Sequence, residues 1–100
     1  SIDVVVIDVS FVSLQDILPS VAKLSNKNTK VLAMVKPQFE AKYSNVKHKG
    51  VIKNDRIRRD ILKDFEIWVQ KLFVIENKAD SEVAGAKGNR ERFYLLKKPQ

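Results

Sequence analysis

Two charged side chains follow apolar runs that are typical of buried strands. Asp8 comes directly after the run of residues 2–7, and Lys36 follows the run of residues 31–35. The carboxyl ends of parallel strands meet at one edge of a sheet, and ligands bind there. The sequence therefore predicts a carboxylate and an amine that face one crevice.

Lys36 is followed by Pro37, which restricts the lysine backbone to an extended conformation and so fixes the direction of the side chain. A lysine that acts as a general base has to lose its proton near neutral pH, which requires burial or a nearby cation. A neighbouring carboxylate such as Asp8 has the opposite effect, because its negative charge stabilises the protonated form of the lysine. We therefore expect the pair to position a substrate, or to work beside a second cation.

Glu91 is a third candidate, in the segment Lys-Gly-Asn-Arg-Glu-Arg-Phe at residues 87–93. Taken alone, it is a surface acid flanked by arginines at the start of the last predicted strand. His48 is the single histidine and the chain has no cysteine, so neither a histidine-based triad nor a metal site is predicted. No glycine-rich phosphate loop of the GxGxxG or Walker type occurs.

The spacing of apolar residues predicts four strands and two helices. Ser13 is expected to cap the first helix and Pro19 to kink it, and Asn54 is expected to cap the second. The predicted order is strand 2–7, helix 14–22, strand 31–35, a lysine-rich loop 36–53, a helix after residue 54, strand 73–79, a turn around 85–88 and strand 92–96.

This alternation predicts a layered α/β fold with a mainly parallel sheet and an antiparallel pair at its end. The run of residues 2–7 is typical of a strand buried on both faces. The chain begins with this strand, so its outer edge is expected to be unpaired, and self-association through that edge follows as a possibility to test. We interpret residues 1–100 as part of one larger domain.

The net charge of +7 is concentrated after the Lys36 segment, since residues 41–63 hold eight basic and two acidic side chains. Such a patch favours a polyanion partner, most often nucleic acid, although a solvated lysine-rich surface gives the same pattern. The hydrophobic fraction of 44% suffices for a core. The absence of cysteine fits an intracellular, cytoplasmic setting, and no apolar run approaches the ~20 residues of a membrane helix.

Five segments resemble one known family. They are Ile-Asp-Val-Ser-Phe-Val-Ser-Leu (7–14), Ile-Leu-Pro (17–19), Val-Lys-Pro-Gln-Phe-Glu-Ala (35–41), Lys-Gly-Val-Ile-Lys-Asn (49–54) and Gly-Asn-Arg-Glu (88–91). In this order they resemble the hemolysin A-like (TlyA) family of FtsJ-type ribosomal RNA methyltransferases. The resemblance implies the C-terminal half of a Rossmann-like methyltransferase sheet with an antiparallel last strand.

The same resemblance implies transfer of a methyl group from S-adenosylmethionine to a ribose 2′-hydroxyl of ribosomal RNA. Enzymes of this type use a Lys-Asp-Lys-Glu tetrad, in which Asp8, Lys36 and Glu91 match the last three members and the first lysine has no counterpart in this segment. That missing lysine would be the second cation that Lys36 needs beside it in order to lose its proton. The implied cofactor-binding residues are Asp8, Val9 and Ser10, and the basic side chains expected to contact RNA are Lys42, Lys47, Lys49, Lys53, Arg56, Arg58 and Arg59.

The segment lacks the family's glycine-rich cofactor loop, its acidic ribose-binding residue and its S4-type RNA-binding domain. We therefore expect the chain alone to be inactive and to bind S-adenosylmethionine poorly.

Two other functions stay open. One is a non-catalytic module that binds RNA or a ribosomal subunit, although such a module has no need of Asp8, Lys36 and Glu91 together. The other is a hemolysin-like, membrane-active protein, but neither predicted helix has the extended basic amphipathic character of a lytic segment, and no membrane partner is expected.

Overall fold

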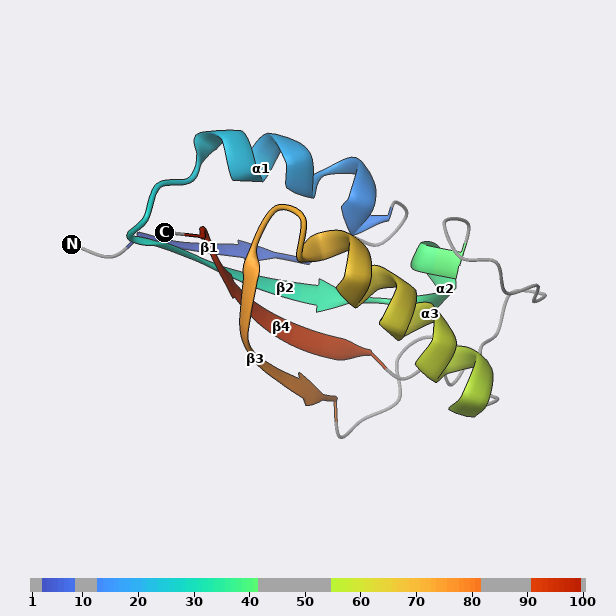
Figure 1. Cartoon of the computed structure of the whole chain (residues 1–100). Helices are drawn as coiled ribbons and strands as arrows, with labels where there is room; N and C mark the ends of the chain where they lie inside the picture. The colour runs from blue at the N-terminus through green and yellow to red at the C-terminus, as the bar shows by residue number, and fades with distance from the viewer. Residues whose placement is uncertain (1–2, 9–12, 42–54, 82–90, 100) are drawn as a thin grey trace.

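The computed structural model describes residues 3–8, 13–41, 55–81 and 91–99 (Figure 1). The elements are β1 (Asp3–Ile7), a 3-10 turn η1 (Leu14–Asp16), α1 (Leu18–Leu24), β2 (Thr29–Val35), α2 (Pro37–Glu40), α3 (Asp55–Val69), β3 (Val74–Asp80) and β4 (Arg92–Lys97). The predicted α/β class is confirmed, and all four strands lie within a few residues of the predicted positions.

The four strands form one sheet in the order β1-β2-β4-β3. β1 and β2 are parallel, from Asp3 opposite Thr29 to Ile7 opposite Ala33. β4 runs antiparallel to both of its neighbours, which confirms the predicted antiparallel pairing of the last two strands. Because β4 lies between β2 and β3, its first residue, Arg92, pairs with Val35 at the carboxyl end of β2.

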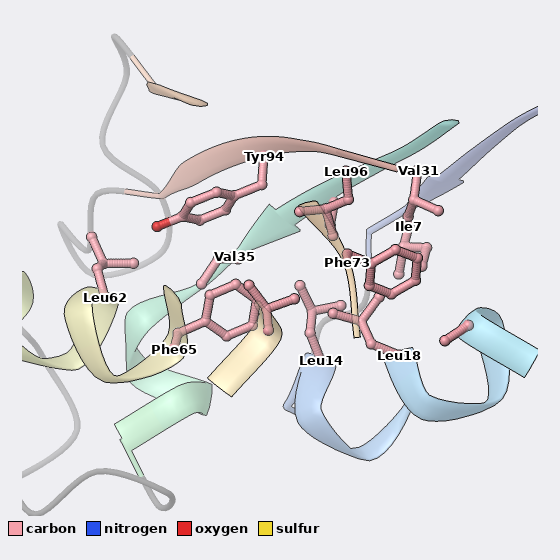
Figure 2. Packing of buried hydrophobic residues seen from close by; sticks show 13 residues of the cluster. Ile7, Leu14, Leu18, Val31, Val35, Leu62, Phe65, Phe73, Tyr94 and Leu96 are labelled. Atoms are coloured by element: carbon pink, nitrogen blue, oxygen red, sulfur yellow. The ribbon is translucent and has the colours of Figure 1, made fainter. Parts of the chain in front are cut away.

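α1 and α3 cover the same face of this sheet, and the core lies between them and the strands (Figures 1 and 2). Alternate residues of β2 point into this core, as expected for a strand with one covered face. Phe65 of α3 packs against Tyr94 of β4 with 5.4 Å between ring centroids. The buried cluster comprises Ile7, Leu14, Leu18, Ala22, Val31, Ala33, Val35, Leu62, Phe65, Val69, Phe73, Tyr94 and Leu96.

The opposite face of the sheet is not covered by any described element. Val4 and Val6 of β1 are 64% and 67% exposed there. The prediction that β1 is buried on both faces is therefore wrong for the described residues, because helices pack on one side only. On its outer edge β1 has no partner strand among these residues, and self-association through that edge stays a prediction.

Two details of the helices differ from prediction. The first predicted helix is divided at Ile17 into η1 and α1, and Pro19 lies in the first turn of α1. Pro19 thus begins a separate helix and does not bend one continuous helix, because a first-turn residue needs no backbone N–H donor. The predicted loop after Lys36 begins with the short helix α2, which also has a proline, Pro37, in its first turn. The predicted cap at Asn54 and the turn at 85–88 lie outside the described residues.

Phe65→Ala is expected to lower the free energy of unfolding by about 3–5 kcal/mol, because Phe65 is fully buried between α3 and the sheet. The matched control is Ile67→Ala, which changes an exposed residue of the same helix and should shift stability by less than about 0.5 kcal/mol. Urea unfolding followed by circular dichroism measures both. Equal losses in the two variants would contradict the placement of the core.

Candidate functional site

Asp8 and Lys36 form an ion pair at the carboxyl edge of the parallel strands. Lys36 Nζ donates to Asp8 Oδ1 at 2.6 Å. The Lys36 side chain is 12% exposed and that of Asp8 is 54% exposed. The amine is thus largely shielded from solvent, while the carboxylate still reaches solvent.

The backbone explains why these two side chains meet. Asp8 follows Ile7, which pairs with Ala33, so Asp8 is level with Met34, two positions before Lys36. Ile7, Ala33 and the core lie on the helix-covered face. Continuing the alternation by one residue beyond each strand assigns Asp8 and Lys36 to the opposite, open face. Lys36 itself is extended, with φ −107° and ψ 106°, as predicted from the proline that follows it.

Glu91 is placed at the same edge by the antiparallel register of β4. Arg92 pairs with Val35, so Glu91, one residue earlier, is level with Lys36. Alternation also directs Glu91 to the open face, since Tyr94 and Leu96 point into the core. The Glu91 carbonyl accepts a hydrogen bond from the Ser81 N–H at 2.9 Å, which joins this residue to the end of β3. By this register, we infer that all three predicted catalytic residues lie at one edge and on one face.

A polar network lies behind Glu91, on the helix-covered face. Arg92 donates to Asp80 at 2.8 Å and to Glu66 at 3.2 Å. Glu66, on α3, also accepts from the hydroxyl of Tyr94 at 2.6 Å and from Lys78 at 3.0 Å. These bonds join α3, β3 and β4, so they fix the backbone from which Glu91 projects.

The network stabilises ionised carboxylates. The hydrogen bond from Arg92 is the main reason that the pKa of Asp80 falls to about 2; burial opposes it, and Arg58 lowers the pKa further. Burial alone would raise the pKa of Glu66, but the bonds from Tyr94 and Lys78 and the charge of Arg92 bring it below its usual value. Burial, and next the hydrogen bond to Glu66, raise the pKa of the Tyr94 hydroxyl.

Glu40 is a buried acid that the sequence analysis did not single out. It is 2% exposed and ends α2, four residues after Lys36. Its Oε1 accepts from Ser13 Oγ at 2.5 Å and its Oε2 from the Leu14 N–H at 2.7 Å. Burial raises the pKa of Glu40, and these two hydrogen bonds oppose the rise. The available signal was that Ser13 and Glu40 belong to the two motifs that also contain Asp8 and Lys36.

Three of the predicted RNA-binding residues lie on described parts of the chain. Arg56 and Arg59 are exposed on the first turns of α3. Arg58 is different, because its guanidinium donates to Asp80 at 2.6 Å and the side chain is mostly buried. We therefore assign Arg58 to the network that holds α3 against β3 and not to a phosphate-binding surface. The other four predicted residues, Lys42, Lys47, Lys49 and Lys53, lie outside the described residues.

Of the predicted cofactor-binding residues, Asp8 is described, whereas Val9 and Ser10 lie outside the described residues. Among described residues, no group of three or more acidic, histidine or cysteine side chains is arranged to hold a metal ion. None of the helices described here is long and apolar enough to cross a membrane.

Comparison with known proteins gives one consistent family. Residues 1–98 match the family model described as FtsJ-like methyltransferase. The chain is 36% identical over 95 residues to the 23S rRNA (cytidine-2′-O)-methyltransferase TlyA of Campylobacter jejuni, with 92% of this chain and 36% of that protein covered. It is 37% identical over 92 residues to Hemolysin A of Brachyspira hyodysenteriae, with 88% and 37% covered.

A solved structure of a protein named as a hemolysin from Streptococcus thermophilus matches with a TM-score of 0.84 and 33% identity. The match covers 98% of this chain and 36% of that one. A second, from Lactococcus lactis, also has a TM-score of 0.84, with 31% identity, and covers 97% and 47%. This chain thus spans about a third of the length of the curated relatives it matches.

Asp80→Asn is expected to destabilise the fold at neutral pH and to have little effect near pH 2. The pKa of Asp80 is lower in the folded state than in the unfolded chain, so its stabilisation is present above about pH 4 and disappears as pH falls toward 2. The side chain is 39% exposed, so solvent screening limits the loss at pH 7 to about 1 kcal/mol. Urea unfolding at pH 7, 5, 3 and 2 measures the difference, and an equal loss at every pH would contradict the charged pair.

Proposed function

Because the chain belongs to the FtsJ-like methyltransferase family, we propose that it is the C-terminal part of a domain that methylates a ribose 2′-hydroxyl of ribosomal RNA. The observation that carries this proposal is the ion pair of Lys36 and Asp8 at the carboxyl edge of β1 and β2. Glu91, at the same edge by register, completes the group. Relatives that carry the TlyA name are described as 23S or 16S/23S rRNA (cytidine-2′-O)-methyltransferases.

Each of the three side chains has a role that its chemistry suits. The amine of Lys36, held against Asp8, can donate a hydrogen bond to the 2′-oxygen and orient it. The hydroxyl proton is taken up by the pair, because Lys36 can accept it once its own proton has passed to Asp8 Oδ1. Glu91 holds either the ribose or Lys36. Catalysis by such a group consists mainly of alignment, which is worth several orders of magnitude in rate.

S-adenosylmethionine is the cofactor we propose for this site, and the donor set fits it. The carboxylate of Asp8 is more than half exposed on the open face, where a negative group favours a positively charged sulfonium. When bound, S-adenosylmethionine supplies a methyl group already activated by that positive sulfur. Val9 and Ser10, next to Asp8, are the further residues we propose for its binding.

The proposed partner is ribosomal RNA or a ribosomal subunit, and the reaction is then cytoplasmic. Residues 41–63 hold eight of the nineteen basic side chains of the chain. Arg56 and Arg59, exposed at the start of α3, are the described residues suited to phosphate contacts, and the proposal extends to Lys42, Lys47, Lys49 and Lys53. Binding through such contacts weakens steeply as salt concentration rises.

Lys36→Met in the full-length protein is expected to lower the rate of methyl transfer to ribosomal RNA by about 100-fold or more, because the substrate hydroxyl loses its orienting and proton-accepting group. Asp8→Asn and Glu91→Gln should also lower it. Transfer of a radioactive methyl group from S-adenosylmethionine to ribosomal RNA measures the rate.

The matched control is Lys30→Met. Lys30 also lies on β2 and points to the same face, but at the far end, where it pairs with Glu76. It should keep at least half of the activity. If Lys36→Met and Lys30→Met are equally active, Lys36 is not catalytic. If the unsubstituted protein binds ribosomal RNA but transfers no methyl group, the chain belongs to a binding module.

A further inference from the structure

The two segments that carry Asp8 and Lys36 are joined by one buried carboxylate. Ser13 lies five residues after Asp8 and caps η1, where its hydroxyl also accepts from the Gln15 N–H at 2.9 Å. Glu40 lies four residues after Lys36, and its N–H donates to the Lys36 carbonyl at 3.3 Å. The bonds from Ser13 and Leu14 to Glu40 therefore close a bridge between the segment that follows β1 and the one that follows β2.

The bridge requires a side chain whose two terminal atoms both form hydrogen bonds. An ionised carboxyl group accepts hydrogen bonds at both oxygens and donates none, and here each oxygen faces one donor from the other segment. Burying such a group is unfavourable without good hydrogen bonds, and burial accordingly raises the pKa of Glu40. A residue that only filled space at this position would not need two polar atoms, so the carboxyl group serves the bridge itself.

We propose that Glu40, acting through Ser13 and Leu14, is a positioning residue that fixes the Asp8–Lys36 pair. Glu40 is 2% exposed and Ser13 is fully buried, so neither can touch a substrate. Their bridge lies beside the core, because Leu14 packs into the buried cluster, whereas the pair faces the open side of the sheet. This inference rests on the proposed function of that pair.

The bridge matters because β1 ends before Asp8 and β2 ends before Lys36. Both residues lie just beyond the ladder of the sheet, and the ladder alone does not set the distance between the segments that follow. Displacement of reacting groups by about 1 Å lowers rates by about 100-fold. A connection between the two segments, only a few residues beyond the pair, limits such displacement.

The test uses the full-length protein and measures kcat and KM for ribosomal RNA well below the unfolding temperature. Ser13→Ala removes one donor and Glu40→Ala removes both acceptors. Both are expected to lower kcat by about 10- to 100-fold and to leave KM within about threefold, since the RNA-binding surface is unchanged. Glu40→Gln should restore most of kcat, because its amide accepts from the Leu14 N–H and donates to Ser13 Oγ.

Val69→Ala is the control for simple destabilisation. Val69 is fully buried in α3 and belongs to neither segment, so this variant should lower the unfolding temperature while kcat stays unchanged. If Ser13→Ala loses no more kcat than Val69→Ala at matched unfolding temperatures, the positioning role is overturned. The positioning role is also overturned if Glu40→Gln loses as much kcat as Glu40→Ala.

A second readout does not depend on methyl transfer. In protein with nitrogen-15-labelled lysine, the side-chain ammonium signal of Lys36, identified by its loss in Lys36→Met, reports the pairing with Asp8. This signal should change in Ser13→Ala and should remain unchanged in Glu40→Gln and Val69→Ala. If this pattern is found in a protein that transfers no methyl group, the positioning role holds and the proposed function fails. An unchanged signal in Ser13→Ala and Glu40→Ala overturns the positioning role whatever the activity.

Discussion

The parallel register of β1 and β2 decides whether a site exists on this chain. It places Ile7 opposite Ala33, and this pairing sets both the edge and the face at which Asp8 and Lys36 emerge. A slip of one residue would reverse the faces of one strand, because side chains alternate along it. The slip is resisted by the core, since Ile7, Ala33 and Val35 are all buried against the helices. Hydrophobic burial on one face therefore fixes the placement of charge on the other.

The polar groups of the molecule are divided between these two faces in a way that suits their tasks. On the helix side, Glu66, Asp80 and Tyr94 are closed into hydrogen bonds that join α3, β3 and β4. On the open side, the carboxylate of Asp8 keeps half of its surface in contact with solvent. The first group stabilises the strands, and the second stays accessible. A carboxylate locked by several donors is a poor partner for a substrate, so the accessible Asp8 suits the proposed site better than the bonded acids behind it.

Much of the fold could be predicted from the sequence, because its strands and helices have clear periodicities. The runs at 2–7 and 31–35 and the apolar face of α3 were identified correctly. The insertion of β4 between β2 and β3 was not, since strand order depends on long-range pairing that leaves no local pattern. The same limit explains the two missed roles. Neither the pairing of Arg58 with Asp80 nor the bridge from Ser13 to Glu40, 22 and 27 residues apart, leaves a signal in sequence spacing.

The charges near the pair bear on how Lys36 works. A lysine next to a carboxylate keeps its proton unless a second cation opposes that effect. Arg92 on β4 and Arg58 on α3 are both bound to Asp80 on the helix side, so neither supplies this effect at the open face. In the proposed site, Lys36 orients the 2′-oxygen, and the hydroxyl proton leaves through Lys36 and the exposed carboxylate of Asp8. A second cation at this edge would favour the loss of that proton, so the rate of the proposed step depends on charge supplied from beyond these strands.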